Sequence, residues 1–158
     1  MRRVLFVCTA NRCRSPLAEG ILKHLLETEY AATSLADVEV ASAGVQAILG
    51  SPALPESVQV AAEHGIDLAE HASQPVSREL IEAFDYILAM EPAHLRTMSF
   101  YSSQAKMKST LLKSFIEKNP KKQTIKDPVG QPLRLHRDCY KELERSIRGF
   151  IKFLADGR

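Results

Sequence analysis

The 158-residue sequence has no tryptophan, three cysteines and seven glycines. A small, odd number of cysteines argues against a structural disulfide framework and suits a chain whose thiols stay reduced. Apolar runs are all far shorter than the roughly 20 residues that a membrane helix needs. The start Met1-Arg2-Arg3 leads into a strand without the apolar segment of a signal peptide. We therefore expect a cytoplasmic protein that does not associate with a membrane.

Charge imbalance is also absent, since the formal net charge is only +2. Basic stripes with interleaved aromatic residues are missing, so nucleic-acid binding is not expected. The densest basic stretch, residues 118–126, is interpreted as a solvated loop, with steering of an anionic substrate as the alternative. The histidines show no metal-ligand spacing, and no nucleotide-binding glycine loop is present, so we expect neither a metal nor another cofactor.

Predicted strands alternate with predicted helices along the sequence, with proline and glycine between them. This order predicts a single domain, residues 1–158, of the α/β class. The run at residues 4–7 is continuously apolar, which is typical of a strand buried on both faces of a parallel sheet. We expect a three-layer sandwich with a central four-stranded parallel sheet, helices on both faces and a functional site at the carboxyl ends of the strands. The predicted strands are 4–7, 38–43 and 86–90, with a fourth short strand within 109–115, and the predicted helices are 16–30, 56–64, 135–154 and two that begin at Ser77 and Pro92.

The most informative segment directly follows the first predicted strand. Residues 8–16 place Cys8 and Arg14 six positions apart, and Ser15-Pro16 open a helix. Loop amides, the helix N-terminus and the Arg14 guanidinium would together form a cradle for a phosphate-like anion. The same groups favour a thiolate, so we expect Cys8 to be a nucleophile at neutral pH. The alternative is a strand-end cysteine that only packs in the core.

Three further segments stand in a defined order after this loop. They are residues 41–44, residues 85–91 and the pair Asp127-Pro128. In these segments and in its loop the chain resembles the low-molecular-weight protein tyrosine phosphatases over nearly its whole length. The resemblance implies a phosphoprotein phosphatase that forms a phosphocysteine at Cys8 and releases inorganic phosphate. The phosphate-binding loop would consist of Thr9, Ala10, Asn11, Arg12, Cys13, Arg14 and Ser15.

The resemblance also implies roles for single residues. Asp127 would protonate the leaving group and later activate water, although an Asp-Pro pair alone is also typical of a turn. Ser15 can donate a hydrogen bond to the sulfur of Cys8, with a helix N-cap as its alternative role. Cys13 is a candidate redox partner of Cys8 in a reversible disulfide, or else an inert thiol. Cys139, on the last predicted helix, is interpreted as packing.

Asn11 is the expected shaping residue of the loop, because asparagine tolerates left-handed backbone conformations. The matching asparagine of the family is held by a serine and a histidine, which correspond here to Ser42 and His71. The alternatives are a satisfied serine at a strand end and a surface histidine.

Two positions depart from the pattern of the tyrosine-directed members, which usually have an aliphatic residue at Arg12 and often an aromatic residue at Val129. A branch that hydrolyses phosphoarginine is similar at residues 42–45 and 127–130. Its marker is a threonine at the place of Arg12, however, and a cationic side chain there would repel a guanidinium. Phosphotyrosine is therefore the expected substrate, with phosphoarginine as the alternative.

Two hypotheses from other functional classes have less support in the sequence. A thiol-dependent arsenate reductase on this scaffold would need a pair of resolving cysteines, but residues 66–138 contain no cysteine. An anion-binding redox sensor would use Cys8 and Cys13 as a switch and would show no catalytic turnover. The sequence gives no indication of an oligomeric state.

Overall fold

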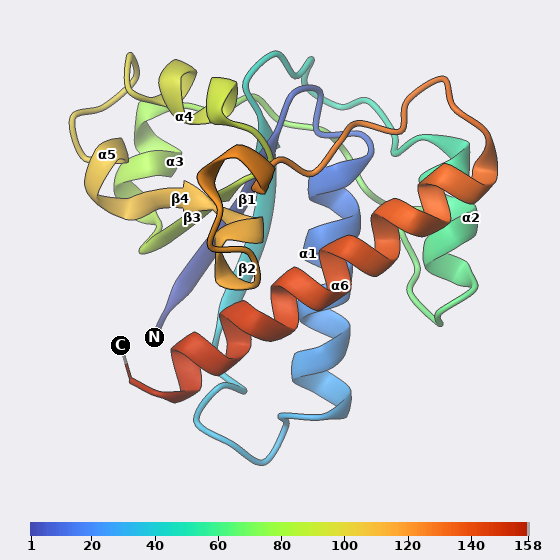
Figure 1. The fold of residues 1–158 in the computed structure, drawn as a ribbon, viewed down its shortest axis with the longest axis horizontal. Helices are drawn as coiled ribbons and strands as arrows, with labels where there is room; N and C mark the ends of the chain where they lie inside the picture. Colours follow the sequence, from blue (N-terminus) through green and yellow to red (C-terminus); the bar gives the residue numbers. More distant parts are fainter. Residues whose placement is uncertain (158) are drawn as a thin grey trace.

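A four-stranded parallel sheet runs through the computed structural model, which describes residues 1–157 (Figure 1). The strands lie in the order β2-β1-β3-β4, and each neighbouring pair is parallel. Because β1 has a partner on both sides and its residues 4–7 are fully buried, this segment is apolar without alternation. The strand bounds are β1 (Arg3–Cys8), β2 (Glu39–Gly44), β3 (Tyr86–Ala89) and β4 (Ser109–Leu111).

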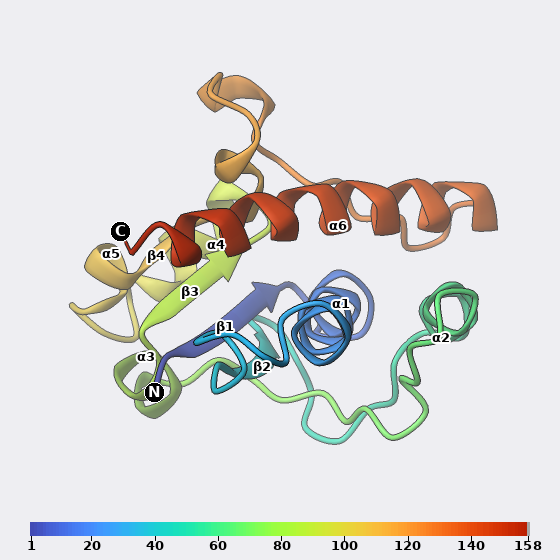
Figure 2. The ribbon, with the colours of Figure 1, turned by 90° about the horizontal axis from the view of Figure 1, so that it is seen from below.

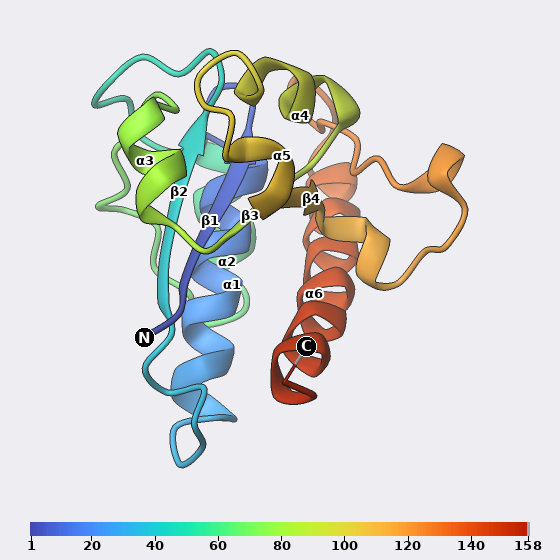
Figure 3. The ribbon, with the colours of Figure 1, turned by 90° about the vertical axis from the view of Figure 1, so that its left-hand side faces the viewer.

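Helices cover both faces of this sheet, and Figures 2 and 3 show α6 and α3 on opposite sides of it. Alternate side chains of β1 divide between two cores: Val4 and Phe6 pack in the larger one, and Leu5 and Val7 in the smaller one. The larger core contains α1 (Arg14–Thr28), α2 (Pro55–Ala62) and α6 (Leu133–Ala155). The smaller core contains α3 (Arg78–Ala83), α4 (Pro92–Met98) and α5 (Ala105–Lys108). The predicted α/β sandwich is therefore confirmed.

The fourth strand is short and lies within residues 109–115, as the sequence predicted. Strand β4 ends at Leu111, and the chain continues as a 3-10 helix, η1 (Leu112–Phe115). This turn brings Phe115 against α6, where its ring centroid lies 5.2 Å from that of Phe150. The apolar residues after 111 thus pack against a helix instead of extending the sheet. A second 3-10 helix, η2 (Pro120–Lys122), lies in the loop that follows.

The register of the sheet brings three chain segments to one edge. Cys8 is paired with Gly44, and Val7 with Ala89, so β1, β2 and β3 end side by side. In a parallel sheet this carboxyl edge is where ligands bind. Within residues 1–157, no helix combines the length and apolarity needed to cross a membrane.

Candidate active site

The chain passes from β1 into α1 through a tight loop that begins at Cys8. Asn11 adopts a positive φ of 56°, the left-handed conformation expected for this residue. Helix α1 begins at Arg14 with Cys13 at the N-cap position, so Ser15 lies inside the first turn. The alternative role of Ser15 as N-cap is therefore wrong, because the helix starts two residues earlier than the predicted helix 16–30.

Cys8 and Ser15 are buried side by side, with 2.9 Å between Sγ and Oγ. The hydroxyl oxygen of Ser15 also accepts a hydrogen bond of 2.8 Å from Nδ2 of Asn11. Since the Asn11 amide is the donor there, the hydroxyl hydrogen of Ser15 remains available for another acceptor. The nearest is the sulfur, because the carbonyl oxygen of Ala43 is 3.4 Å away. Ser15 can thus stabilise a thiolate at Cys8.

Asn11 is held from several sides by residues outside the loop. Its Nδ2 donates to Oγ of Ser42 at 2.9 Å, and its Oδ1 accepts from the backbone N–H of Gln74 at 2.9 Å. The half-buried His71 donates from Nε2 to the backbone oxygen of Asn11 at 2.7 Å. Ser42 in turn donates to Oε1 of Glu19 at 2.6 Å. The structure thus brings Ser42 and His71 to Asn11, and it adds Gln74 and Glu19, for which the sequence gave no signal.

Gly44, at the end of β2, lies against the loop. A Cβ atom at this position would come within 2.5 Å of the carbonyl oxygen of Thr9 and 2.8 Å of the backbone nitrogen of Asn11. The next residue, Val45, donates its N–H to the carbonyl oxygen of Cys8 at 3.0 Å. Strand β2 therefore supports the loop by direct backbone contact, which only glycine permits at residue 44.

Arg14 is almost fully buried beneath the loop. Its Nη1 donates to Oε2 of Glu91 at 2.6 Å and to the carbonyl oxygen of Ile125 at 2.8 Å. Its Nη2 lies 3.3 Å from Oγ1 of Thr9 and 3.5 Å from Oδ2 of Asp127. Among the described residues, its Nε–H has no acceptor. Glu91 and Ile125 thus fix one side of the guanidinium and leave the Nε and Nη2 edge for two oxygens of a tetrahedral anion.

Glu91 and His94, for which the sequence predicted no role, form a capping box at the start of α4. The Glu91 side chain accepts from the backbone N–H of His94, and His94 Nδ1 accepts from the N–H of Glu91 at 3.2 Å. Nδ1 is therefore unprotonated, and Nε2–H donates to Oγ1 of Thr9 at 2.9 Å. Burial, together with the charge of Arg14, lowers the pKa of His94 to about 4. The three-residue spacing of Glu91 and His94, directly after the predicted strand 86–90, is the sequence feature that could have indicated this capping box.

Above the loop lies a cavity of about 110 Å³ that gathers the predicted nucleophile, arginine and aspartate. Asp127 is partly exposed there, and its Oδ1 accepts from the N–H of Val129 at 3.1 Å, so the Asp-Pro pair also forms a turn. Val129 is half-exposed at the wall of the cavity. The residues that line the cavity are Cys8, Ala10, Arg12, Cys13, Arg14, Leu54, Asp127 and Val129.

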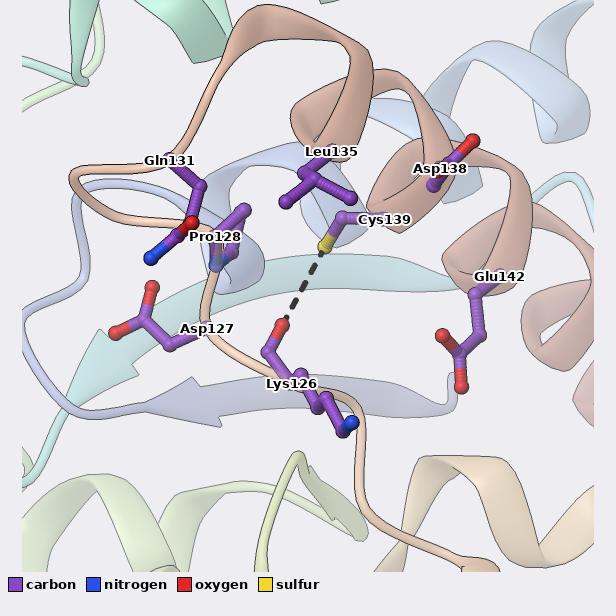
Figure 4. A pocket seen from close by; sticks show the side chains of 8 residues that line it. All are labelled: Lys126, Asp127, Pro128, Gln131, Leu135, Asp138, Cys139 and Glu142. Carbon is purple, nitrogen blue, oxygen red and sulfur yellow. Dashed lines mark hydrogen bonds between the residues drawn. The ribbon is translucent and has the colours of Figure 1, made fainter.

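The other two cysteines are buried and unpaired, like Cys8. Burial raises the pKa of the Cys13 thiol to about 12, and it also raises the pKa of Cys139. Cys139 lies behind Asp127 in a second cavity of about 320 Å³, where its sulfur points toward the carbonyl oxygen of Lys126 (Figure 4). Both thiols are therefore protonated at neutral pH, and the Cys8–Cys13 disulfide stays a prediction.

The remaining predicted features lie outside this cluster. Residues 118–126 form an irregular loop apart from η2, and Lys118, Lys121, Lys122 and Lys126 are exposed. No group of three or more histidine, cysteine, aspartate or glutamate side chains within residues 1–157 is arranged to hold a metal ion.

The site has the design of a cysteine-based phosphatase, because a buried cysteine with a hydroxyl donor faces the same small cavity as a fixed guanidinium and a carboxylate. Comparison with known proteins identifies the family within this class. Residues 3–157 match the family model of the low molecular weight phosphotyrosine protein phosphatases, and the chain belongs to this family. The family expected from the sequence is thereby confirmed.

Curated relatives and solved structures agree with this assignment. The chain is 32% identical to the low molecular weight protein-tyrosine-phosphatase Etp of Escherichia coli strain K12, covering 96% of this chain and 94% of the relative. It is 37% identical to the protein-arginine-phosphatase of Geobacillus stearothermophilus, covering 92% and 90%. The crystal structure of a low molecular weight protein tyrosine phosphatase from T. tengcongensis superposes with a TM-score of 0.85 at 35% identity, covering 96% and 99%.

Proposed function

We propose that this protein removes phosphate from phosphotyrosine in protein substrates through a phosphocysteine intermediate, with Cys8 as nucleophile and Asp127 as general acid. The single observation that supports this most is the shared cavity lined by Cys8, Arg14 and Asp127. The hydroxyl of Ser15, 2.9 Å from the sulfur, supplies the hydrogen bond that a thiolate needs. Nucleophile, charge stabilisation and proton donor therefore converge on one small cavity.

In the first step the Cys8 thiolate attacks phosphorus, so that an S–P bond forms while the bond from phosphorus to the phenolic oxygen breaks. The Nε and Nη2 edge of Arg14 and the loop amides hold the equatorial oxygens, where negative charge gathers. The protonated carboxyl group of Asp127, with Oδ2 3.5 Å from Nη2 of Arg14, gives its proton to the leaving oxygen and becomes a carboxylate. The products are tyrosine and phosphocysteine.

In the second step water attacks the phosphocysteine, and the S–P bond breaks. Asp127, now ionised, accepts the proton of the water, and inorganic phosphate leaves the cradle. Cys8 departs as a thiolate, and Ser15 stabilises the charge that returns to the sulfur. The side chains and loop amides of this chain supply all these roles. Its three unpaired cysteines suit a reducing compartment such as the cytoplasm.

The side chain at the mouth of the cavity favours phosphotyrosine over phosphoarginine. Arg12 lines the cavity, and a second guanidinium brought there by phosphoarginine would meet a like charge. Phosphoarginine is the second candidate, because Val129 offers no aromatic ring to stack on a tyrosyl group. The relative from Geobacillus stearothermophilus, named a protein-arginine-phosphatase, also supports this second candidate.

The test compares phosphotyrosine and phosphoarginine peptides of equal sequence, in EDTA, with wild type and the variants Cys8→Ser and Cys139→Ser. We expect faster hydrolysis of phosphotyrosine, loss of turnover in Cys8→Ser and retained turnover in Cys139→Ser, because Cys139 lines the second cavity and not the one that contains Cys8 and Arg14. Faster hydrolysis of phosphoarginine would favour the second candidate. Phosphate binding and reversible oxidation without turnover would support the redox sensor instead.

A further inference from the structure

Arg12 is fixed in place by the segment that leads into α2. Its Nε–H donates to the carbonyl oxygen of Pro52 at 2.8 Å. Its own carbonyl oxygen accepts from the N–H of Leu54 at 2.8 Å. Side chain and backbone of Arg12 are thus bonded to the same short segment, so the guanidinium is held at the rim of the cavity before any substrate binds. This preorganisation lowers the entropic cost of using it as a binding group.

The rest of this guanidinium is uncommitted. Among the described residues, neither Nη1 nor Nη2 of Arg12 donates to an acceptor, and no carboxylate forms an ion pair with it. Arg14 differs, because Glu91 and Ile125 take up its Nη1. Arg12 therefore presents two NH₂ groups and a positive charge that the protein does not compensate. Such donors bind carboxylates with paired hydrogen bonds.

The position of these donors relative to the cradle decides which part of a substrate meets them. Under the proposed function the phosphate would bind at Cys8 and Arg14, and the tyrosyl ring would lie beside Leu54 and Val129, which line the same cavity. The peptide backbone that bears the phosphotyrosine then lies at the rim, beside Arg12. Residues that flank the phosphotyrosine are consequently the groups within reach of the free NH₂ groups.

We infer that Arg12 is a specificity-determining residue that selects phosphotyrosine sites with an acidic side chain directly beside the phosphotyrosine. This inference rests on the proposed function and adds the charge of the neighbouring residue to the substrate definition. The carboxylate of that neighbour pairs with the NH₂ groups of Arg12, and the Nε bond to Pro52 stays intact.

The experiment uses pairs of phosphotyrosine peptides that differ only in an aspartate or an asparagine next to the phosphotyrosine, on either side. The readout is the ratio of kcat/KM within a pair, which cancels any general effect of a substitution on catalysis. We expect a ratio of about five for the wild-type enzyme, a value typical of one partly exposed charged hydrogen bond. The ratio decreases to about one in Arg12→Gln, and Arg12→Lys retains part of it.

Arg145→Gln is the matched control, because Arg145 is an exposed arginine in the middle of α6, so its loss changes net charge equally. It keeps the full ratio if the effect is local. Raising the ionic strength lowers the wild-type ratio, a measurement that depends on no variant. A wild-type ratio of one, an unchanged ratio in Arg12→Gln or a loss in Arg145→Gln would overturn the inference. Failure to hydrolyse either peptide of a pair would overturn the proposed function itself, which is a separate result.

Discussion

The sulfur of Cys8 lies 2.9 Å from the hydroxyl oxygen of Ser15, whose remaining contacts leave its hydrogen free for that sulfur. A hydrogen bond to a charged group contributes about 1.5–3 kcal/mol, so Ser15→Ala should lower kcat by about 10- to 100-fold. The greater loss falls on the second step, in which the thiolate leaves. Rapid-quench kinetics should therefore show phosphoenzyme accumulating in Ser15→Ala. Ser146→Ala, a buried helical serine away from the site, serves as control and shows no such accumulation.

Glu91 should act on catalysis through Arg14, because its carboxylate holds Nη1 at 2.6 Å. In Glu91→Gln the guanidinium loses its charged anchor, and we expect kcat/KM to decrease by about tenfold or more. The inhibition constant for inorganic phosphate should increase in parallel, because the same edge of Arg14 binds the product. Glu82→Gln breaks an exposed pair with Arg78 and should change neither quantity. An unaltered phosphate affinity in Glu91→Gln would contradict this role.

Asp127 should matter in proportion to how much the leaving group needs a proton. In Asp127→Asn we expect kcat to decrease by about 100-fold or more for phosphotyrosine, since general acid catalysis is lost. The decrease should be much smaller for aryl phosphates whose phenols are already acidic. Asp138→Asn, an exposed aspartate on α6 beside the second cavity, is the matched control. Equal losses for all leaving groups would assign Asp127 to the turn alone.

His94 makes stability depend on pH in mildly acid solution. Its pKa is about 4 in the folded protein and 6.5 in an unfolded chain, so the unfolded state binds more protons between these values. The free energy of unfolding should therefore decrease as pH falls from 6.5 to 4, by about 3 kcal/mol in total. Urea unfolding of wild type and His94→Gln at several pH values measures this. A slope that is the same in both proteins over this window would exclude His94 as its source.

Gly44→Ala should damage the loop because the new Cβ would lie within 2.5 Å of the carbonyl oxygen of Thr9. The atom that the Cβ would meet belongs to the backbone, so the strand or the loop must shift, at a cost of about 1–3 kcal/mol and with loss of activity. Gly20→Ala is an instructive comparison, since its Cβ would meet the side-chain ends of Ile66 and Leu68. It should lower the thermal midpoint while the folded enzyme keeps its kcat. Full activity in Gly44→Ala would show that the loop tolerates the shift.

The order of strands and helices was readable from local patterns because each element has an apolar face or run of its own. The departures arose where packing competed with local propensity. Within the segment 109–115, which was predicted to hold a short strand, residues 109–111 pair in the sheet, and residues 112–115 form a 3-10 helix in contact with α6. Helix α1 begins two residues before the predicted start, so Ser15 is not the N-cap. Boundaries of this kind depend on neighbours that the local sequence does not specify.

The sequence by itself determined the α/β class, the loop from Cys8 to Arg14 and the family, because these depend on residue types at short, fixed spacings. The tertiary structure alone decided that Glu91 anchors Arg14 and that Arg12 keeps two free NH₂ groups at the rim. Glu91 lies 77 positions from Arg14, and Pro52, which binds Nε of Arg12, lies 40 positions from Arg12. Which side chains meet across such separations is set by the register of the sheet and the course of the loops, neither of which a local pattern encodes.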